Sequence, residues 1–301
     1  PHLETLDGLA YDFQAAGEFI LIETEPGAEN PFQVQTRFEP WKGSDVVSVT
    51  TRMAVEVGDT VVEVDAKGPD KILLDGRALT PAALESGSIS LDSDSAPELT
   101  FSPDLSSATI LLNDTGEKLE IANQRGFLNI TTFLTDADGG NAGYVRGLLG
   151  DAEQDGTADD LALRDGTVLA SRDADTLYGP FADSWRLDGS PDKTALFSNS
   201  VSFPDPFPAT AVTVEDLPDD RRADAEAKAI GAGLSPGDSR FDAAVLDYAL
   251  TGEDAFIQGG VSDTPAPEDK LTPAPEDRAT ATFGVLTDVE TITEGDDGSQ
   301  T

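Results

Sequence analysis

The sequence predicts a mainly β fold, an antiparallel β-sandwich followed by a small C-terminal α-helical module and a disordered tail. Three observations carry this prediction. Apolar and polar residues alternate along most of the stretch from Glu18 to Leu134, short turn signals interrupt that alternation, and the apolar period becomes helical after residue 213. A chain of 301 residues is long enough for one large domain, or two smaller ones, with a real core.

The alternation is clearest in two runs, residues 32–38 and 47–57. Phe32, Val34 and Phe38 share one face of the first run, and every second residue from Val47 to Val57 shares one face of the second. Each run therefore predicts a strand with one buried face. Turn signals separate the runs: Gly58-Asp59, Gly68-Pro69-Asp70, Asp75-Gly76, Asn113-Asp114-Thr115-Gly116 and Gln124-Arg125-Gly126. Strand character returns at residues 167–170 and 183–187.

Two helices are expected near the C-terminal end. Pro218 can open the first helix, which runs to Ile230 and ends at Gly231. Ser239 can cap the second, whose apolar residues recur at helical spacing until Gly252. The chain is therefore expected to contain a β domain (1–197), a linker (198–213), a small helical module (214–259) and a Pro/acid-rich linker or tail (260–301).

The tail repeats a short motif, because TPAPEDKL at residue 264 is followed directly by TPAPEDRA at residue 272. Alternating proline and charge favour an extended, solvated linker. We expect this linker to tether the two modules to other modules of the same polypeptide.

The composition is strongly acidic, with 58 Asp and Glu against 19 Lys and Arg and a formal net charge of −39. Such a surface repels nucleic acid and anionic membranes, so the expected partners are cations in a salt-containing setting. Cysteine is absent and histidine occurs once, as His2, so disulfides, thiolate sites and paired imidazole ligands are excluded. No apolar run approaches the roughly 20 residues of a membrane span, so no membrane insertion is expected. The chain starts at Pro1 without a signal peptide, so no targeting signal indicates its compartment.

An acidic loop follows the apolar run Gly147-Leu-Leu-Gly150. Its carboxylates are Asp151, Glu153, Asp155, Asp159 and Asp160, with no Lys or Arg among them. Counted from Asp151, oxygens fall at positions 1, 3, 5 and 9 with glycine at 6, which is close to a calcium-binding loop. Ala162 stands where a bidentate Glu is usual, and the loop lies between strands, so an EF-hand is not indicated. A solvated acidic turn is the alternative.

Calcium is the metal that this donor set favours. Zinc prefers the imidazole and thiolate ligands that the loop lacks, and magnesium keeps more of its water than a shell rich in protein oxygens allows.

Three stretches together resemble the von Willebrand factor type D domain in its bacterial, cysteine-free form. They are PHLETLDGLAYDFQAAGEFILIE at the start, GLLGDAEQDGTADDLALRDGTVL in the middle and FADSWRL around Trp185, and the resemblance covers roughly residues 1–197. DYALTGEDAF, from Asp247, resembles the C8-like helical module that follows this domain in secreted relatives, without its cysteines.

The resemblance implies a calcium site shared by an N-terminal Asp-Gly turn and the acidic loop. It assigns Asp7 in that turn and Asp151 as the first loop ligand, followed in order by Asp160 and Asp159 and then by Asp155 and Glu153. It also implies a secreted or cell-surface location, a role in adhesion or matrix assembly, and an extracellular protein or polysaccharide as partner.

The first two residues suggest a second possibility. Many members of the family begin with Gly-Asp-Pro-His, and in some of them the Asp-Pro bond cleaves itself. Pro1 and His2 would then be the terminus of such a product, and truncation of a longer sequence is the alternative.

An enzyme acting on other molecules is the rival class of function. The sequence has no G-x-S-x-G or H-E-x-x-H motif, and a histidine-dependent triad would have only His2 to use. A carboxylate-dependent hydrolase remains the less favoured alternative, because acidic pairs occur throughout the chain. We therefore expect a calcium-binding extracellular module rather than an enzyme.

Overall fold

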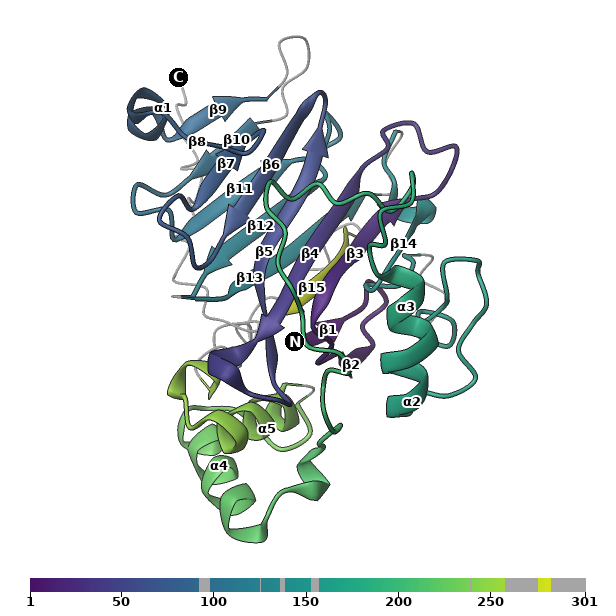
Figure 1. The fold of residues 1–301 in the computed structure, drawn as a ribbon, viewed down its shortest axis with the longest axis vertical. Helices are drawn as coiled ribbons and strands as arrows, with labels where there is room; N and C mark the ends of the chain where they lie inside the picture. Colours follow the sequence, from purple (N-terminus) through teal and green to yellow (C-terminus); the bar gives the residue numbers. More distant parts are fainter. Residues whose placement is uncertain are drawn as a thin grey trace, which may run out of the picture.

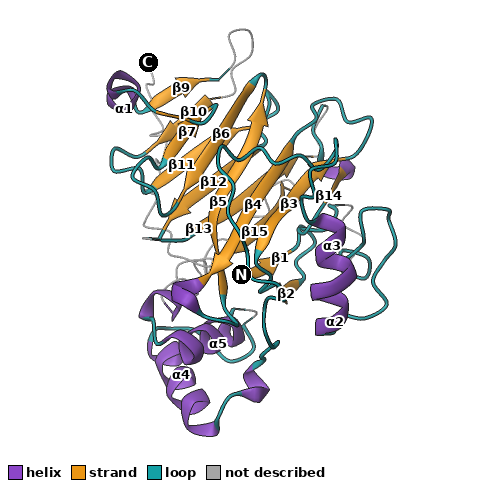
Figure 2. Cartoon of the chain, in the orientation of Figure 1, coloured by secondary structure: helices purple, strands orange, loops and turns teal. Residues whose placement is uncertain are grey.

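The computed structural model describes residues 1–91, 98–124, 126–135, 139–152, 157–238, 240–257 and 276–282. The described chain is mainly β, as the sequence predicts, and its strands form two antiparallel sheets (Figure 1). Helices α4 (Asp219–Gly231) and α5 (Phe241–Thr251) lie at one end of the strands, α2 (Ala174–Thr176) and α3 (Ala182–Trp185) lie along one side, and the short α1 (Pro81–Ser86) lies at the other end (Figure 2). No helix among these residues is both long and apolar enough to cross a membrane.

The seven-stranded sheet is built from consecutive hairpins plus one distant strand. Its order is β14 (Val145–Arg146), β3 (Gly17–Thr24), β4 (Gln33–Pro40), β5 (Ser48–Val57), β6 (Thr60–Asp65), β7 (Ile72–Leu74) and β8 (Arg77–Ala78). Asp75 and Gly76 join β7 to β8 with positive φ angles of 50° and 72°, which suits the tight turn that matches the twist of the two strands. The runs 32–38 and 47–57 therefore form strands β4 and β5, as predicted.

The eight-stranded sheet joins the two ends of the described chain. Its order is β2 (Ala10–Asp12), β1 (His2–Glu4), β15 (Glu276–Thr282), β13 (Leu128–Thr135), β12 (Lys118–Asn123), β11 (Ser107–Leu111), β10 (Glu98–Phe101) and β9 (Ser88–Ser90). A short helix α1 (Pro81–Ser86), capped by the Thr80 side chain, precedes β9. The core between the sheets is aromatic, and Phe13, Phe19 and Phe38 are fully buried in edge-on and stacked contacts.

Strand β15 was not predicted. It pairs with β1 and β13 from within the expected tail, residues 260–301, whose other residues lie outside the described part of the chain. The only apolar residues in its sequence, EDRATAT, are two alanines that alternate with threonine, which is too weak a signal to indicate a strand after a proline-rich repeat. The repeat runs over residues 264–279. Residues 264–275 lie outside the described residues, whereas Glu276–Ala279 form the start of β15, so the predicted solvated linker is wrong for these four residues.

The outer face of the seven-stranded sheet is polar but buried, because the segment 186–199 crosses it. Gln35 donates to the Thr194 carbonyl at 2.9 Å, and Arg37 donates to the Asn199 carbonyl at 2.7 Å and to Glu18 at 2.6 Å. Strands with one buried face were expected from the alternation. The structure buries both faces of β4 because a segment distant in sequence supplies the polar partners.

The strand expected at residues 183–187 is wrong. Residues 183–185 belong to the helical run α2 (Ala174–Thr176), η3 (Leu177–Phe181) and α3 (Ala182–Trp185), and Arg186 forms only an isolated bridge with Phe19. The Asp173 side chain accepts from the Thr176 N–H at 2.8 Å and caps the start of this run. Residues 167–170 form only an isolated bridge, Val168 to Ala162, rather than a strand.

The C-terminal helices pack against the β domain. They are η4 (Val214–Asp216), α4 (Asp219–Gly231) and α5 (Phe241–Thr251), and Gly252 ends α5 with a φ of 72°, as predicted. Pro218 precedes α4 as its cap instead of opening it, and Ser239 lies outside the described residues. Trp41 in η1 (Trp41–Gly43) and Phe127 contact Phe256 at centroid separations of 5.4 Å each. The helical module therefore shares an apolar core with the sheets.

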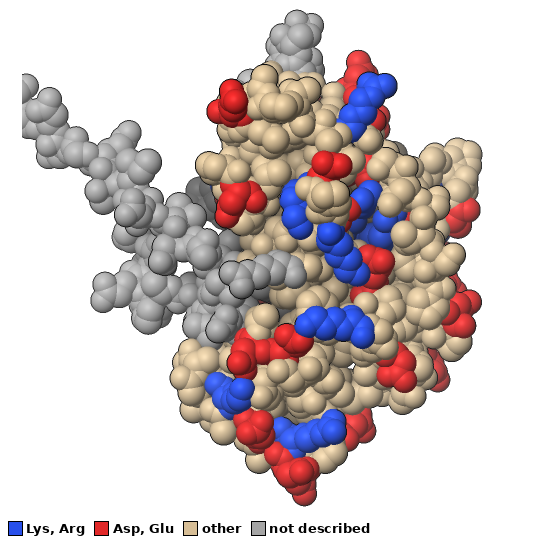
Figure 3. Space-filling model, turned by 60° about the vertical axis from the view of Figure 1, so that its left-hand side comes forward, with Lys and Arg blue, Asp and Glu red and all other residues tan. Residues whose placement is uncertain are grey.

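Positive and negative side chains are mixed on the face of the molecule shown in Figure 3. Basic side chains lie among acidic ones rather than in one continuous patch. Elsewhere in the described residues, ion pairs such as Lys67 with Glu39, at 3.2 Å, also join the two signs of charge. Several of the few cations of this acidic chain thus lie beside carboxylates, and this face offers no broad basic surface to a polyanion.

Candidate metal centre

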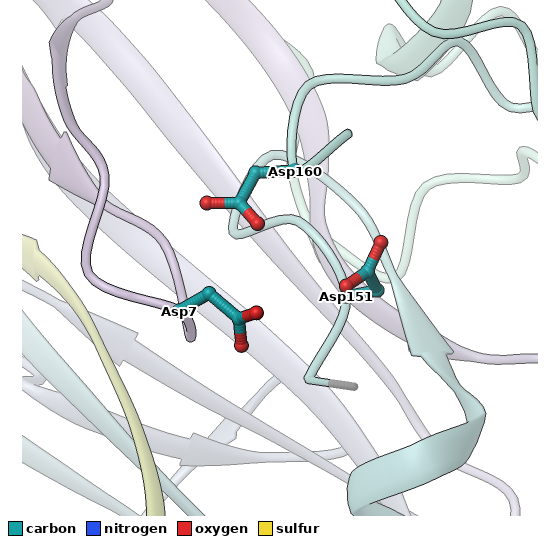
Figure 4. A group of neighbouring side chains, drawn as sticks. All are labelled: Asp7, Asp151 and Asp160. Atoms are coloured by element: carbon teal, nitrogen blue, oxygen red, sulfur yellow. The ribbon is translucent and has the colours of Figure 1, made fainter. Parts of the chain in front are cut away.

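Three carboxylates from two distant parts of the chain lie around one small space (Figure 4). Asp7, Asp151 and Asp160 each place an oxygen within 4.8 Å of the others. Asp7 comes from the turn between β1 and β2, and the other two residues come from the two ends of the acidic loop. Tertiary structure thus creates a group of acids that no single stretch of sequence contains.

The N-terminal turn is hydrogen-bonded directly to the acidic loop. The Thr5 hydroxyl donates to Asp160 Oδ2 at 2.5 Å and accepts from the Leu9 N–H at 2.8 Å. The Leu6 N–H donates to the Leu149 carbonyl at 2.9 Å. These bonds close the turn that carries Asp7 and hold it against the loop.

The run 147–150 anchors the first end of the loop in the core. Leu148 and Leu149 are fully buried, and the Leu149 N–H donates to the Leu21 carbonyl on β3 at 3.1 Å. Gly150 has a φ of +73°, and a Cβ there would lie 2.9 Å from the Asp160 carbonyl oxygen. Glycine is therefore needed for the turn and for the close approach of the two loop ends.

The second end of the loop is also fixed. Leu161 is buried, and its carbonyl accepts from the Leu169 N–H at 2.9 Å. Trp185 Nε1 donates to the Ala162 carbonyl at 3.0 Å. Asp160 is thus held on backbone that is bonded to two other segments, which a freely solvated turn would not require.

Of the three carboxylates, Asp160 has the environment that a bound cation would stabilise most clearly. Its side chain is 1% exposed, and its Oδ1 atom has no hydrogen-bond partner among the described residues. Burial raises the pKa of Asp160; the Thr5 hydrogen bond and Arg172 oppose this rise, and the charges of Asp7 and Asp159 add to it. A buried carboxylate oxygen without a partner is costly, and a bound cation would remove that cost.

The donor set fits calcium. Every candidate ligand is a carboxylate oxygen, and the described residues contain no imidazole or thiolate in the group. The structure brings together Asp7, Asp151 and Asp160 of the predicted ligands. Asp159 is half-buried and stands outside the triad, while Glu153 and Asp155 lie outside the described residues.

Thr5 is a contributor that the sequence analysis missed. A threonine two residues before an aspartate is common, so only the fold shows that its hydroxyl reaches a residue 155 positions away. Its hydrogen bond orients Oδ2 of Asp160 and leaves Oδ1 for another partner.

Pro1 and His2 lie at a different place, between the β domain and helix α5. Both are buried, His2 Nδ1 is hydrogen-bonded to Asp12, and His2 Nε2 lies 3.0 Å from Asp247 Oδ2. Burial acts to lower the pKa of His2, but Asp247 and Asp12 outweigh it and raise the pKa to about 9. Nothing in the described residues tests self-cleavage before Pro1, which stays a prediction.

Comparison with known proteins identifies no relative of this chain. No protein-family model matches this chain, and no curated protein matches it either. The resemblance to the von Willebrand factor type D domain therefore rests on the three sequence stretches alone.

Proposed function

We propose that this protein is a calcium-binding extracellular module of a larger secreted or cell-surface bacterial protein. The observation that carries the proposal is the unpartnered, buried Oδ1 of Asp160 beside the carboxylates of Asp7 and Asp151. Calcium bound by these three residues would join the N-terminal turn to the acidic loop. In a chain without cysteine, such a bond would take the place of a disulfide as a long-range tie.

The biological role that we propose is adhesion or matrix assembly. The resemblance to the von Willebrand factor type D domain supports it, as does the acidic surface. Calcium concentrations outside cells suit sites of modest affinity, and extracellular modules bind calcium at roughly 10⁻⁴ to 10⁻³ M.

Calcium titration by calorimetry tests this proposal. Asp7→Asn and Asp160→Asn should each weaken calcium binding about 100-fold, because each removes a charged oxygen from the shell while keeping the shape of the side chain. Asp175→Asn is the matched control, since Asp175 is an exposed acid in α2 that does not belong to the triad. Equal effects of all three substitutions would show that diffuse charge alone attracts calcium, and the proposal would fail.

A further inference from the structure

Two residues of the triad also line a hollow of about 190 Å³. Asp151 and Asp160 form part of its wall together with Asp159, which faces the hollow without belonging to the triad. The opposite walls come from residues 143–147 and from the turn that includes Leu163 and Val168. A cation held by Asp151 and Asp160 would therefore lie at the wall of a hollow rather than inside a closed cage.

The three carboxylates leave coordination positions of a calcium ion open for a ligand from outside the chain. Calcium takes six to eight oxygens, and the three carboxylates that meet among the described residues do not fill such a shell, because Oδ2 of Asp160 already accepts the hydrogen bond from Thr5. Water or two oxygens of a ligand could complete it. The hollow is smaller than the roughly 300 Å³ or more of a site for a drug-sized molecule, so it suits one small ring or the end of a chain.

Charge argues for a neutral ligand. Asp7, Asp151, Asp159, Asp160 and Glu25 lie in or beside this hollow, and a divalent cation neutralises two of these five charges. Arg146 is the cation that lines the hollow, but its Nε already donates to Glu23 at 3.0 Å. The local field remains negative after metal binding, so a carboxylate or sulfate ligand would be repelled.

The wall also has an apolar part that is open to solvent. Val168 lines the hollow and is 46% exposed, which makes it one of few large apolar side chains at the described surface. Val145, beside it in the hollow, is buried. A ring with hydroxyl oxygens on one side and C–H groups on the other matches this combination of acids and aliphatic surface.

We propose that the hollow binds a neutral sugar residue of an extracellular polysaccharide, with two neighbouring hydroxyls completing the calcium shell. Asp159 would accept a hydrogen bond from a sugar hydroxyl, and Val168 would contact the apolar face of the ring. This inference rests on the proposed function, because it needs the calcium site, and it selects a polysaccharide over a protein as the partner.

The test measures whether the full chain is retained on beads that carry neutral monosaccharides. The set of monosaccharides should include every common relative orientation of two neighbouring hydroxyls. We expect retention on at least one sugar in millimolar calcium and its loss in EDTA. Val168→Gln should weaken that retention about tenfold, the loss expected for one buried apolar contact. Calorimetry should show unchanged calcium affinity in this variant, because Val168 holds no metal ligand.

Ile230→Gln is the matched control, since Ile230 is 53% exposed on α4, at the far end of the molecule from β14 (Figure 1). It should bind sugar beads like the parent chain. Calcium binding without retention on any sugar, or equal retention in calcium and EDTA, would overturn the sugar assignment alone. Retention on anionic polysaccharide beads but not on neutral ones would also overturn it. A chain that binds no calcium would instead refute the proposed function.

Discussion

At the scale of single residues, the site depends on two positions that carry no charge. The Thr5 hydroxyl donates to Oδ2 of Asp160, and Gly150 lets the loop ends approach each other. A carboxylate cluster binds a cation well only when its geometry is fixed before binding, since otherwise ordering the ligands costs free energy. These two residues supply part of that order.

Substituting the glycines of the loop tests this interpretation. Gly150→Ala and Gly166→Ala each place a side chain at a positive φ, of +73° and +84°, which costs about 1–2 kcal/mol of stability. Nothing lies within 4 Å of a Cβ at Gly166, whereas a Cβ at Gly150 meets the Asp160 backbone. Gly150→Ala should therefore be the more destabilising in urea unfolding and should alone weaken calcium binding. Equal calcium affinity in both variants would contradict a role for this contact.

At the scale of elements, one buried histidine connects the β domain to the helical module. His2 on β1 lies between Asp12 on β2 and Asp247 on α5. The charge of His2 is favoured in the folded state, because its pKa there is about 9 against an ordinary value of 6.5.

This shift predicts a loss of stability in alkaline solution. A raised pKa in the folded state stabilises the protein fully below pH 6.5, and the contribution is lost as pH rises through about 9. The difference is at most about 3 kcal/mol. Asp247→Asn should reduce the loss between pH 6.5 and pH 9.5 in urea unfolding, because one of the two carboxylates that hold the proton on His2 is removed. An unchanged pH dependence in this variant would argue against the pairing.

At the scale of the whole molecule, a formal net charge of −39 makes self-repulsion a constant cost of folding. Any salt should relieve part of that cost by screening, whereas calcium should add a specific contribution. The two effects can be separated because only the specific one depends on the triad.

Thermal unfolding in matched ionic strengths should separate them. Calcium at about 100 times its dissociation constant adds about 2.7 kcal/mol, which corresponds to a rise of roughly 5–10 °C in Tm beyond the effect of sodium chloride. Asp160→Asn should lose this additional rise and keep the response to sodium chloride. If both salts raise Tm equally in the parent chain, the stabilisation is screening alone.

The sequence by itself determined the class of fold and the donor atoms of the candidate site. Alternation in residues 32–38 and 47–57 was sufficient for β4 and β5, because period two is a local property of the chain. Gly252 ended α5 as expected for the same reason. The run of acids after Gly150 indicated an oxygen-ligated cation, because the types of donor atom in a loop can be read from its residues alone.

Tertiary structure decided what depends on distant partners. The cover of the polar sheet face by residues 186–199, the place of β15 between β1 and β13, and the packing of the helices on Trp41 involve segments far apart in sequence. Residues 183–185 became helical because a cap at Asp173 and burial of Trp185 outweighed a weak local preference. Asp7 was assigned from a family resemblance, but its approach to Asp151 and Asp160 follows from the turn that Thr5 holds against the loop. Contacts between distant segments leave no periodic pattern in the sequence. The residues between two such segments do not indicate which carboxylates will come together in the fold.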